Sequence, residues 1–138
     1  MSKVAIALVV GLILCIPIHM TAAPDWSVTV VDGNGLPVAG ATIREININY
    51  TFVSQGHENN RITDALGSAH FAHVREWHLL GRGIAGTFSS ALAGIHASFG
   101  THASVFAFGK GEGSAIRDGY VEDWTGSPEV YASKIVVH

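Results

Sequence analysis

The sequence predicts an all-β fold, a Greek-key β-sandwich of about seven strands with one short helix. Two observations indicate this class. Short runs of β-branched residues alternate with polar ones, and turn-forming residues separate them every eight to twelve positions or so. The chain has 138 residues and a net charge of −3, which suits a single domain. Because phosphates demand clustered Lys and Arg, this weakly acidic chain is a poor candidate for binding nucleic acid.

The first residues have the layout of a secretory signal peptide. Lys3 supplies a positive start, residues 4–18 are apolar apart from one glycine, and residues 21–23 are small. We therefore expect a leader over residues 1–23, a domain over residues 24–138 and a secreted or periplasmic location. An uncleaved anchor is the alternative. The only cysteine, Cys15, lies within the leader, so no disulfide would stabilise the mature domain.

The next part of the chain alternates strands and turns. Residues 26–31 predict a strand, and Asp32-Gly-Asn-Gly35 predicts a reversal. In the second strand Ile46, Ile48 and Tyr50 fall on one face. The polar residues 55–61 predict a loop. Further strands are expected at residues 62–64, 68–74, 103–108 and 130–137.

The middle of the chain carries no Lys, Arg, Asp or Glu over residues 83–109. A helical stripe within it predicts a short helix near residues 87–99, formed by Phe88, Leu92, Ile95 and Phe99. Thr87 is placed to cap its start and Gly100 to end it.

Two motifs resemble the carboxypeptidase regulatory-like domain, which has the transthyretin-like (prealbumin-like) β-sandwich fold. They are the Gly-x-Pro-Val-x-Gly-Ala turn within residues 31–43 and the Thr-Asp-x-x-Gly turn within residues 63–71. The residues expected to build these turns are Gly35, Pro37, Gly40, Asp64 and Gly67. The resemblance implies a seven-stranded sandwich that often serves as an accessory module. The related hydroxyisourate hydrolases end in Tyr-Arg-Gly-Ser, which the C-terminal residues 134–138 lack.

These features predict a secreted or periplasmic, non-catalytic module without a cofactor, which binds a protein or a surface polymer or gives structural support. One alternative is a membrane-associating or self-associating protein that uses the uncharged segment 83–109. Another is a periplasmic metal-binding protein, because His70, His73 and His78 lie close together in the sequence. On a strand, however, His70 and His73 would point to opposite faces.

Other motifs favour structural roles. The Gly81–Gly86 string matches G-x-G-x-x-G but lacks the acidic residue that a dinucleotide site needs, so a loop is expected there. Asn49 begins a glycosylation sequon that matters only in a eukaryote. The remaining candidates are a carboxylate pair (Glu122 or Asp123 with Glu129), a weak Ca²⁺ site (Asp118, Glu122, Asp123) and an aromatic platform (Trp77, Tyr120, Trp124). We expect the acidic side chains to be solvated. We expect the aromatic rings to plug the ends of the sandwich.

Overall fold

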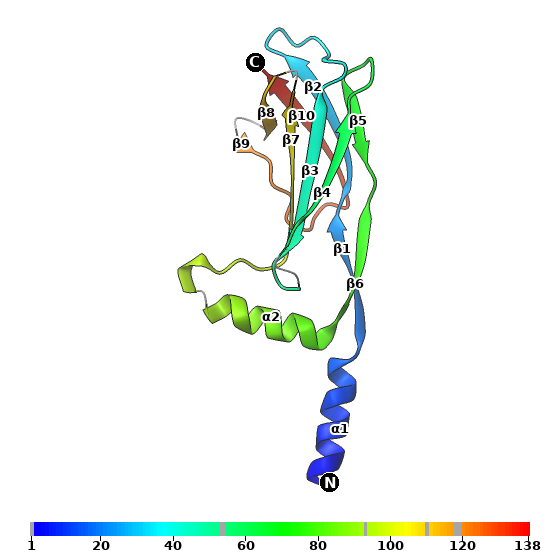
Figure 1. Ribbon diagram of the computed structural model, residues 1–138, viewed down its shortest axis with the longest axis vertical. Coiled ribbons are helices and arrows are strands. Elements are labelled where there is room, and N and C mark those ends of the chain that lie inside the picture. The colour runs from blue at the N-terminus through cyan, green and yellow to red at the C-terminus, as the bar shows by residue number, and fades with distance from the viewer. Residues whose placement is uncertain (1, 53–54, 93, 110, 118–119) are drawn as a thin grey trace.

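The computed structural model describes residues 2–52, 55–92, 94–109, 111–117 and 120–138. Figure 1 shows an elongated molecule with a β-sandwich at one end and two helices at the other. We call residues 24–73 and 101–138 the head, and residues 1–23 and 74–100 the foot. The chain enters through the foot, builds the first half of the head, returns to the foot and then completes the head.

The head is a strongly curved sheet. Its seven main strands follow the order β4-β3-β7-β8-β10-β2-β5, and β9 pairs with β8. The end strands β4 and β5 contact each other, so the sheet nearly closes. All pairings are antiparallel except that between β10 and β2. The strands are β2 (Asp25–Asp32), β3 (Thr42–Asn49), β4 (His57–Ile62), β5 (Ser68–Phe71), β7 (Thr101–Phe108), β8 (Gly113–Arg117), β9 (Tyr120–Val121) and β10 (Val130–Val137).

Alternation along β2 builds the core. Trp26, Val28 and Val30 point inward, with Ser27 and Thr29 exposed between them. They pack with inward residues of the other strands, including Ile43, Phe71, Val105, Ala115, Trp124 and Ile135. Each large apolar side chain buried in this way stabilises the fold by about 1.5–3 kcal/mol. The prediction of an all-β sandwich is confirmed.

The two turns named in the sequence bracket this core. Asp32 Oδ1 accepts hydrogen bonds from the N–H groups of Leu36 and Asn34, both at 2.9 Å. The Leu36 bond is the main influence that lowers the pKa of Asp32. Asp64 Oδ1 likewise accepts from the N–H groups of Leu66 and Ser68, both at 2.9 Å.

Gly67 closes the second of these turns at a φ of 70°. A Cβ there would lie 2.5 Å from the carbonyl oxygen of Val30, so only glycine fits. Gly35 and Gly40 also have positive φ, and Pro37 forms an isolated bridge with Val31.

Three local predictions were wrong. The polar segment 55–61 is not a loop, because residues 57–62 form β4, an exposed edge strand paired with β3. Polar side chains suit such an edge, since no second layer covers them. The helix lies at Leu80–Leu92 rather than 87–99, so Thr87 is inside it and donates its hydroxyl to Gly83 O at 2.9 Å. The Gly81–Gly86 string, expected as a loop, lies within the same helix. The strand predicted at residues 103–108 is confirmed as part of β7.

The foot consists of two helices joined by a two-stranded ribbon. Its elements are α1 (Lys3–Leu14), β1 (Pro17–Ala23), β6 (Val74–Leu79), α2 (Leu80–Leu92) and the single-turn η1 (Gly94–His96). β1 pairs with β6 in an antiparallel ribbon that leads from the head to the helices. In Figure 1 α1 runs along the long axis of the molecule and α2 runs across it. Among the described residues, no helix is long and apolar enough to cross a membrane.

Candidate functional site

The foot exposes large apolar side chains that the head would bury. Leu92 is 83% exposed and Ile95 is 97% exposed, and Phe88 is similarly open. Trp77 on the ribbon is 68% exposed and stacks on His19, with 4.5 Å between ring centroids. Large exposed apolar patches are rare on soluble monomers and mark interaction sites.

The first helix extends this surface. α1 contains no charged residue between Val4 and Leu14, and its apolar side chains are spread around the whole helix. None of its residues is buried. A helix that is apolar all round normally lies in a protein core or in a membrane. Here the described residues provide no core around it.

Charge divides the chain in the same way. The foot carries three basic residues, Lys3, Arg75 and Arg82, and one acidic residue, Glu76. The head carries five basic and ten acidic residues. The molecule therefore has a basic, apolar foot and an acidic head.

Small residues allow the head to contact α2 closely. The tip that follows β3, residues 50–52, contacts the helix at Gly83 and Gly86. A Cβ at Gly86 would lie 1.8 Å from the carbonyl oxygen of Thr51, and one at Gly83 would lie 2.4 Å from the Phe52 ring. A Cβ at Gly81 would likewise lie 3.0 Å from Leu14 of α1. The Gly81–Gly86 string thus serves helix packing, which explains its spacing without a nucleotide.

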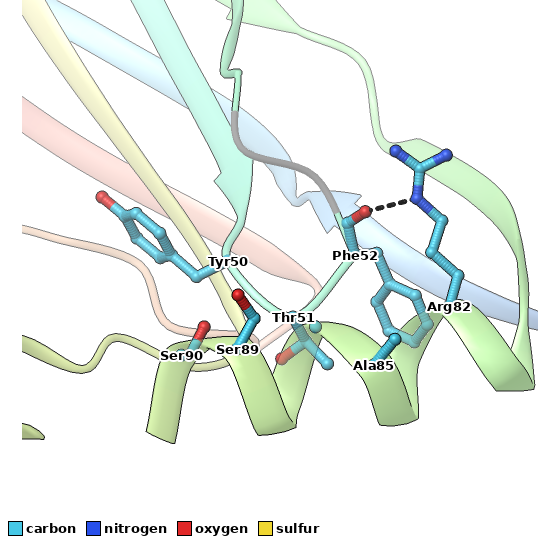
Figure 2. Close-up of a pocket in the computed structure, with 8 residues that line it drawn as sticks. Tyr50, Thr51, Phe52, Arg82, Ala85, Ser89 and Ser90 are labelled. Atoms are coloured by element: carbon cyan, nitrogen blue, oxygen red, sulfur yellow. Dashed lines mark hydrogen bonds between the residues drawn. The ribbon is translucent and has the colours of Figure 1, made fainter. Parts of the chain in front are cut away.

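This contact creates a polar cavity on one flank of α2. The cavity has a volume of about 500 Å³ and is lined by Tyr50, Thr51, Phe52, Arg82, Ala85, Gly86, Ser89 and Ser90. Figure 2 shows hydroxyl groups of the tip and of the helix around it. The Arg82 Nε–H donates to Phe52 O at 2.8 Å, which ties the guanidinium to the tip.

A second, apolar cavity lies on the opposite flank of α2. It measures about 340 Å³, and its helix residues are Leu80, Gly83, Ile84, Thr87 and Phe88. Thr51 and Phe52 of the tip belong to both cavities. α2 is therefore polar on one flank, apolar on the other and fixed to the head between them.

A separate polar cluster occupies the outer face of the head. Asp123 accepts a hydrogen bond from Ser104 Oγ at 2.8 Å, and its other oxygen lies 3.2 Å from His102 Nδ1. The His102 Nε2 faces the carbonyl of Phe99 at 3.2 Å, so neither ring nitrogen is directed at the serine. Tyr50 packs edge-on against His102. This geometry does not place a base on a nucleophile.

The interior of the head contains an unpaired acid. Glu45 is 1% exposed, and neither carboxylate oxygen has a hydrogen-bond partner among the described residues. Burial raises the pKa of Glu45 to about 7, against the opposing charge of Arg61. Glu45 shares the inner face of β3 with Asn47 and Asn49, so the apolar Ile46 and Ile48 lie on the outer face. Burial therefore favours the uncharged form of Glu45.

The three predicted metal-binding histidines do not converge. His70 lies 2.8 Å from Asp25, His73 lies 3.1 Å from Thr21 Oγ1, and His78 stacks on Phe52. Among the described residues, no group of three or more His, Cys, Asp or Glu side chains could hold a metal ion.

The other sequence candidates are also dispersed. Glu122 is buried and accepts from Ser133 Oγ, Asp123 belongs to the outer cluster, and Glu129 faces Arg75 at 3.6 Å. Asp118 lies outside the described residues, as does the side chain of Tyr120. Trp124 is buried in the head, far in sequence from the exposed Trp77.

Asn49 is buried as well. Its side-chain nitrogen donates to Thr101 Oγ1 at 3.1 Å. Because glycosylation modifies this nitrogen, the folded domain does not present the sequon to solvent.

Sequence reasoning found the apolar stripe of α2 but missed the polar cavity beside it. Arg82, Tyr50, Ser89 and Ser90 come from two distant segments, and only the docking of the tip on α2 brings them together. In the sequence, the one available signal of this docking was the spacing of Gly83 and Gly86.

Comparison with known proteins gives no family for this chain: no family model and no curated protein matches it. Similar solved structures include chlorocatechol 1,2-dioxygenase from Pseudomonas putida (16% identity, TM-score 0.44, 86% of this chain and 60% of that one). They also include 3-chlorocatechol 1,2-dioxygenase from Rhodococcus opacus 1CP (13%, 0.41, 87% and 60%). A third is catechol 1,2-dioxygenase from Pseudomonas arvilla C-1 (17%, 0.43, 87% and 52%).

These comparisons overturn several predictions. The chain was expected to be a carboxypeptidase regulatory-like, transthyretin-like domain, but no family model matches and the similar structures are dioxygenases. The same finding contradicts the expectation of a non-catalytic binding module that is not an enzyme, because the similar structures are enzymes. The chain spans between about half and three-fifths of their lengths. At such low identities and TM-scores the likeness assigns no activity to this chain.

Proposed function

We propose that the foot attaches the β-sandwich head to the surface of a lipid bilayer. The observation that carries the proposal is the exposure of apolar side chains on α1, α2 and η1 at one end of the molecule. Hydrocarbon would cover these side chains, and the full burial of each one would stabilise the attachment by about 1.5–3 kcal/mol. The proposal concerns how the head is held, not a reaction.

In this arrangement α1 enters the hydrocarbon. Its 12 residues extend over about 18 Å, against roughly 30 Å for the apolar core of a bilayer. Lys3 lies at the far end, where its long side chain extends toward the opposite headgroups. The uniform apolar surface of α1 suits lipid on every side.

In the same arrangement α2 lies along the surface. Phe88 and Leu92 are exposed to the apolar phase, while Arg82 and Ser89 line the cavity on the head side. Such a two-faced helix is typical of the membrane interface. Trp77 on the ribbon sits next to the start of α2, and tryptophan is enriched at this level of membrane proteins.

The proposal includes the retention of residues 1–23. Ala23 is fully buried in the head core, and β1 pairs with β6 along its length. The Thr101 hydroxyl donates to the carbonyl oxygen of Thr21 at 3.2 Å. Cleavage after Ala23 would remove all of these contacts. The intact mass of protein isolated from the expressing cell should therefore include residues 1–23, and a chain that begins at Pro24 would contradict retention.

Tryptophan quenching tests the attachment. The full chain is reconstituted in phosphatidylcholine vesicles that contain lipids brominated on the acyl chains. Trp26 and Trp124 are buried in the head, so only Trp77 is open to quenching. We expect bromine to quench part of the emission of the native chain and none of the emission of Trp77→Phe. Vesicles that leave the emission unchanged, or a soluble oligomer that does not co-float with them, would contradict the proposal.

A further inference from the structure

We propose that the polar cavity between the tip and α2 binds the phosphoryl-glycerol headgroup of an anionic phospholipid. This inference rests on the proposed attachment, because α2 must lie at the membrane surface for a headgroup to reach the cavity. Its volume of about 500 Å³ falls in the range of small-molecule sites.

The lining has the chemistry of a phosphate site. Arg82 is the only charged residue among the eight that line the cavity, so no carboxylate there repels an anion. Arginine carries five N–H donors in a planar fork that matches phosphate oxygens. The contact with Phe52 O uses Nε, and the described residues take none of the four terminal N–H groups.

Hydroxyl groups provide the remaining polar contacts. Tyr50 lines the cavity from the tip, and Ser89 and Ser90 line it from α2. The hydroxyls of these three residues have no hydrogen-bond partner among the described residues. Hydroxyls both donate and accept, so they can bind phosphate oxygens and glycerol hydroxyls alike. The Thr51 hydroxyl is already bonded to the N–H of Gly100 at 3.0 Å.

The second cavity is separate from this site, because the tip contacts α2 at Gly83 and Gly86 between the two cavities. A lipid bound at the polar cavity would therefore place only its headgroup against the cation and the hydroxyls. Its acyl chains would lie in the bilayer that the proposed attachment places against the foot.

Native mass spectrometry of the full chain tests the site. The protein is released from mixed micelles that contain equal amounts of phosphatidylglycerol and phosphatidylcholine. We expect the native chain to retain one phosphatidylglycerol, at least tenfold in preference to phosphatidylcholine. Arg82→Gln should bring this ratio near one, and the double variant Ser89→Ala/Ser90→Ala should lower it severalfold.

Arg75→Gln is the matched control, because Arg75 is a basic residue of the foot that does not line the cavity. A nonspecific attraction contributes about fivefold per basic residue near an anionic surface. If Arg75→Gln lowers the ratio as much as Arg82→Gln does, or if the native chain shows no preference, the headgroup site is wrong. Quenching of Trp77 by lipid would then still stand, so the two proposals fail separately.

Competition with a soluble ligand tests whether the site binds a lipid or a free polyol phosphate. Glycerol 3-phosphate is added to the same micelles in increasing amounts. We expect little displacement of the retained lipid, because its acyl chains keep it in the micelle next to the foot. Complete displacement at equimolar concentration would overturn the assignment to a lipid and favour a free polyol phosphate.

Discussion

Ile135 and Ile95 are the same side chain in two different surroundings. Ile135 of β10 is fully buried in the core of the head, whereas Ile95 of η1 is 97% exposed on the foot. The head also carries most of the acidic residues, while the foot is basic. The difference shows that the head buries its apolar side chains in its own core, whereas those of the foot need an apolar phase outside the protein to cover them.

Truncating these two side chains breaks the comparison most directly. Ile135→Ala should lower the free energy of unfolding by about 2–5 kcal/mol, since it leaves a cavity in the core. Ile95→Ala should change it by less than about 0.5 kcal/mol, because the side chain touches little. Denaturant titrations followed by the emission of the buried tryptophans give both values. Equal losses would mean that Ile95 is packed within the protein.

A second difference lies inside the head, where Glu45 is buried without a partner. Its pKa is raised from 4.5 to about 7 in the folded state. Between these two pH values the folded state therefore holds a proton that the unfolded state releases. Stability is therefore highest below pH 4.5 as far as Glu45 is concerned and falls as the pH rises toward 7, by about 3 kcal/mol at most. Glu45→Gln should remove this fall.

The measurement is the free energy of unfolding of both chains between pH 4.5 and pH 8. The native chain and Glu45→Gln should diverge as the pH rises, with the variant more stable near pH 8. Parallel curves would show that Glu45 has another partner in the folded head.

The contact between head and foot depends on Gly86. In Gly86→Ala the new methyl group would meet the carbonyl oxygen of Thr51, so the tip should separate from α2 at a cost of about 1–3 kcal/mol. Hydrogen exchange of residues 49–52 and of α2 should become at least tenfold faster. Gly11→Ala is the control, because a Cβ at Gly11 meets nothing within 4 Å. Unchanged exchange in Gly86→Ala would place the tip away from the helix.

The smallest effect is expected on the outer face of the head. Asp123→Asn removes the charge that faces His102 but keeps an acceptor for Ser104. Exposed contacts of this kind contribute about 0.2–1 kcal/mol. A thermal melt of the variant should therefore stay close to that of the native chain. A loss as large as that of Ile135→Ala would assign the cluster a central structural role.

Much of the head was predictable because its strands alternate. β2 and its turn follow from β-branched residues, Asp32 and the glycines after it. β3 shows the limit of this reasoning. Its apolar residues Ile46 and Ile48 face outward, and its polar residues face inward, because the interior of this head accepts polar groups that alternation alone assigns to solvent.

The foot was only partly predictable, since its contacts join distant segments. The stripe of Phe88 and Leu92 indicated a helix, but the glycines at 81, 83 and 86 argued against an earlier start. Those glycines are in fact the contact points for Leu14, Phe52 and Thr51. Local helix propensity penalises glycine, and only the tertiary structure shows why the helix contains it.

Depth measurement by spin labelling tests membrane attachment most directly. In a Cys15→Ser background, a nitroxide is attached either at Phe88→Cys or at Ser89→Cys, two neighbours on different sides of α2. In vesicles we predict that the label at 88 relaxes mainly with oxygen, which concentrates in hydrocarbon, and that the label at 89 relaxes mainly with a water-soluble nickel complex. Equal access of the nickel complex to both positions would contradict the attachment of this foot to a bilayer.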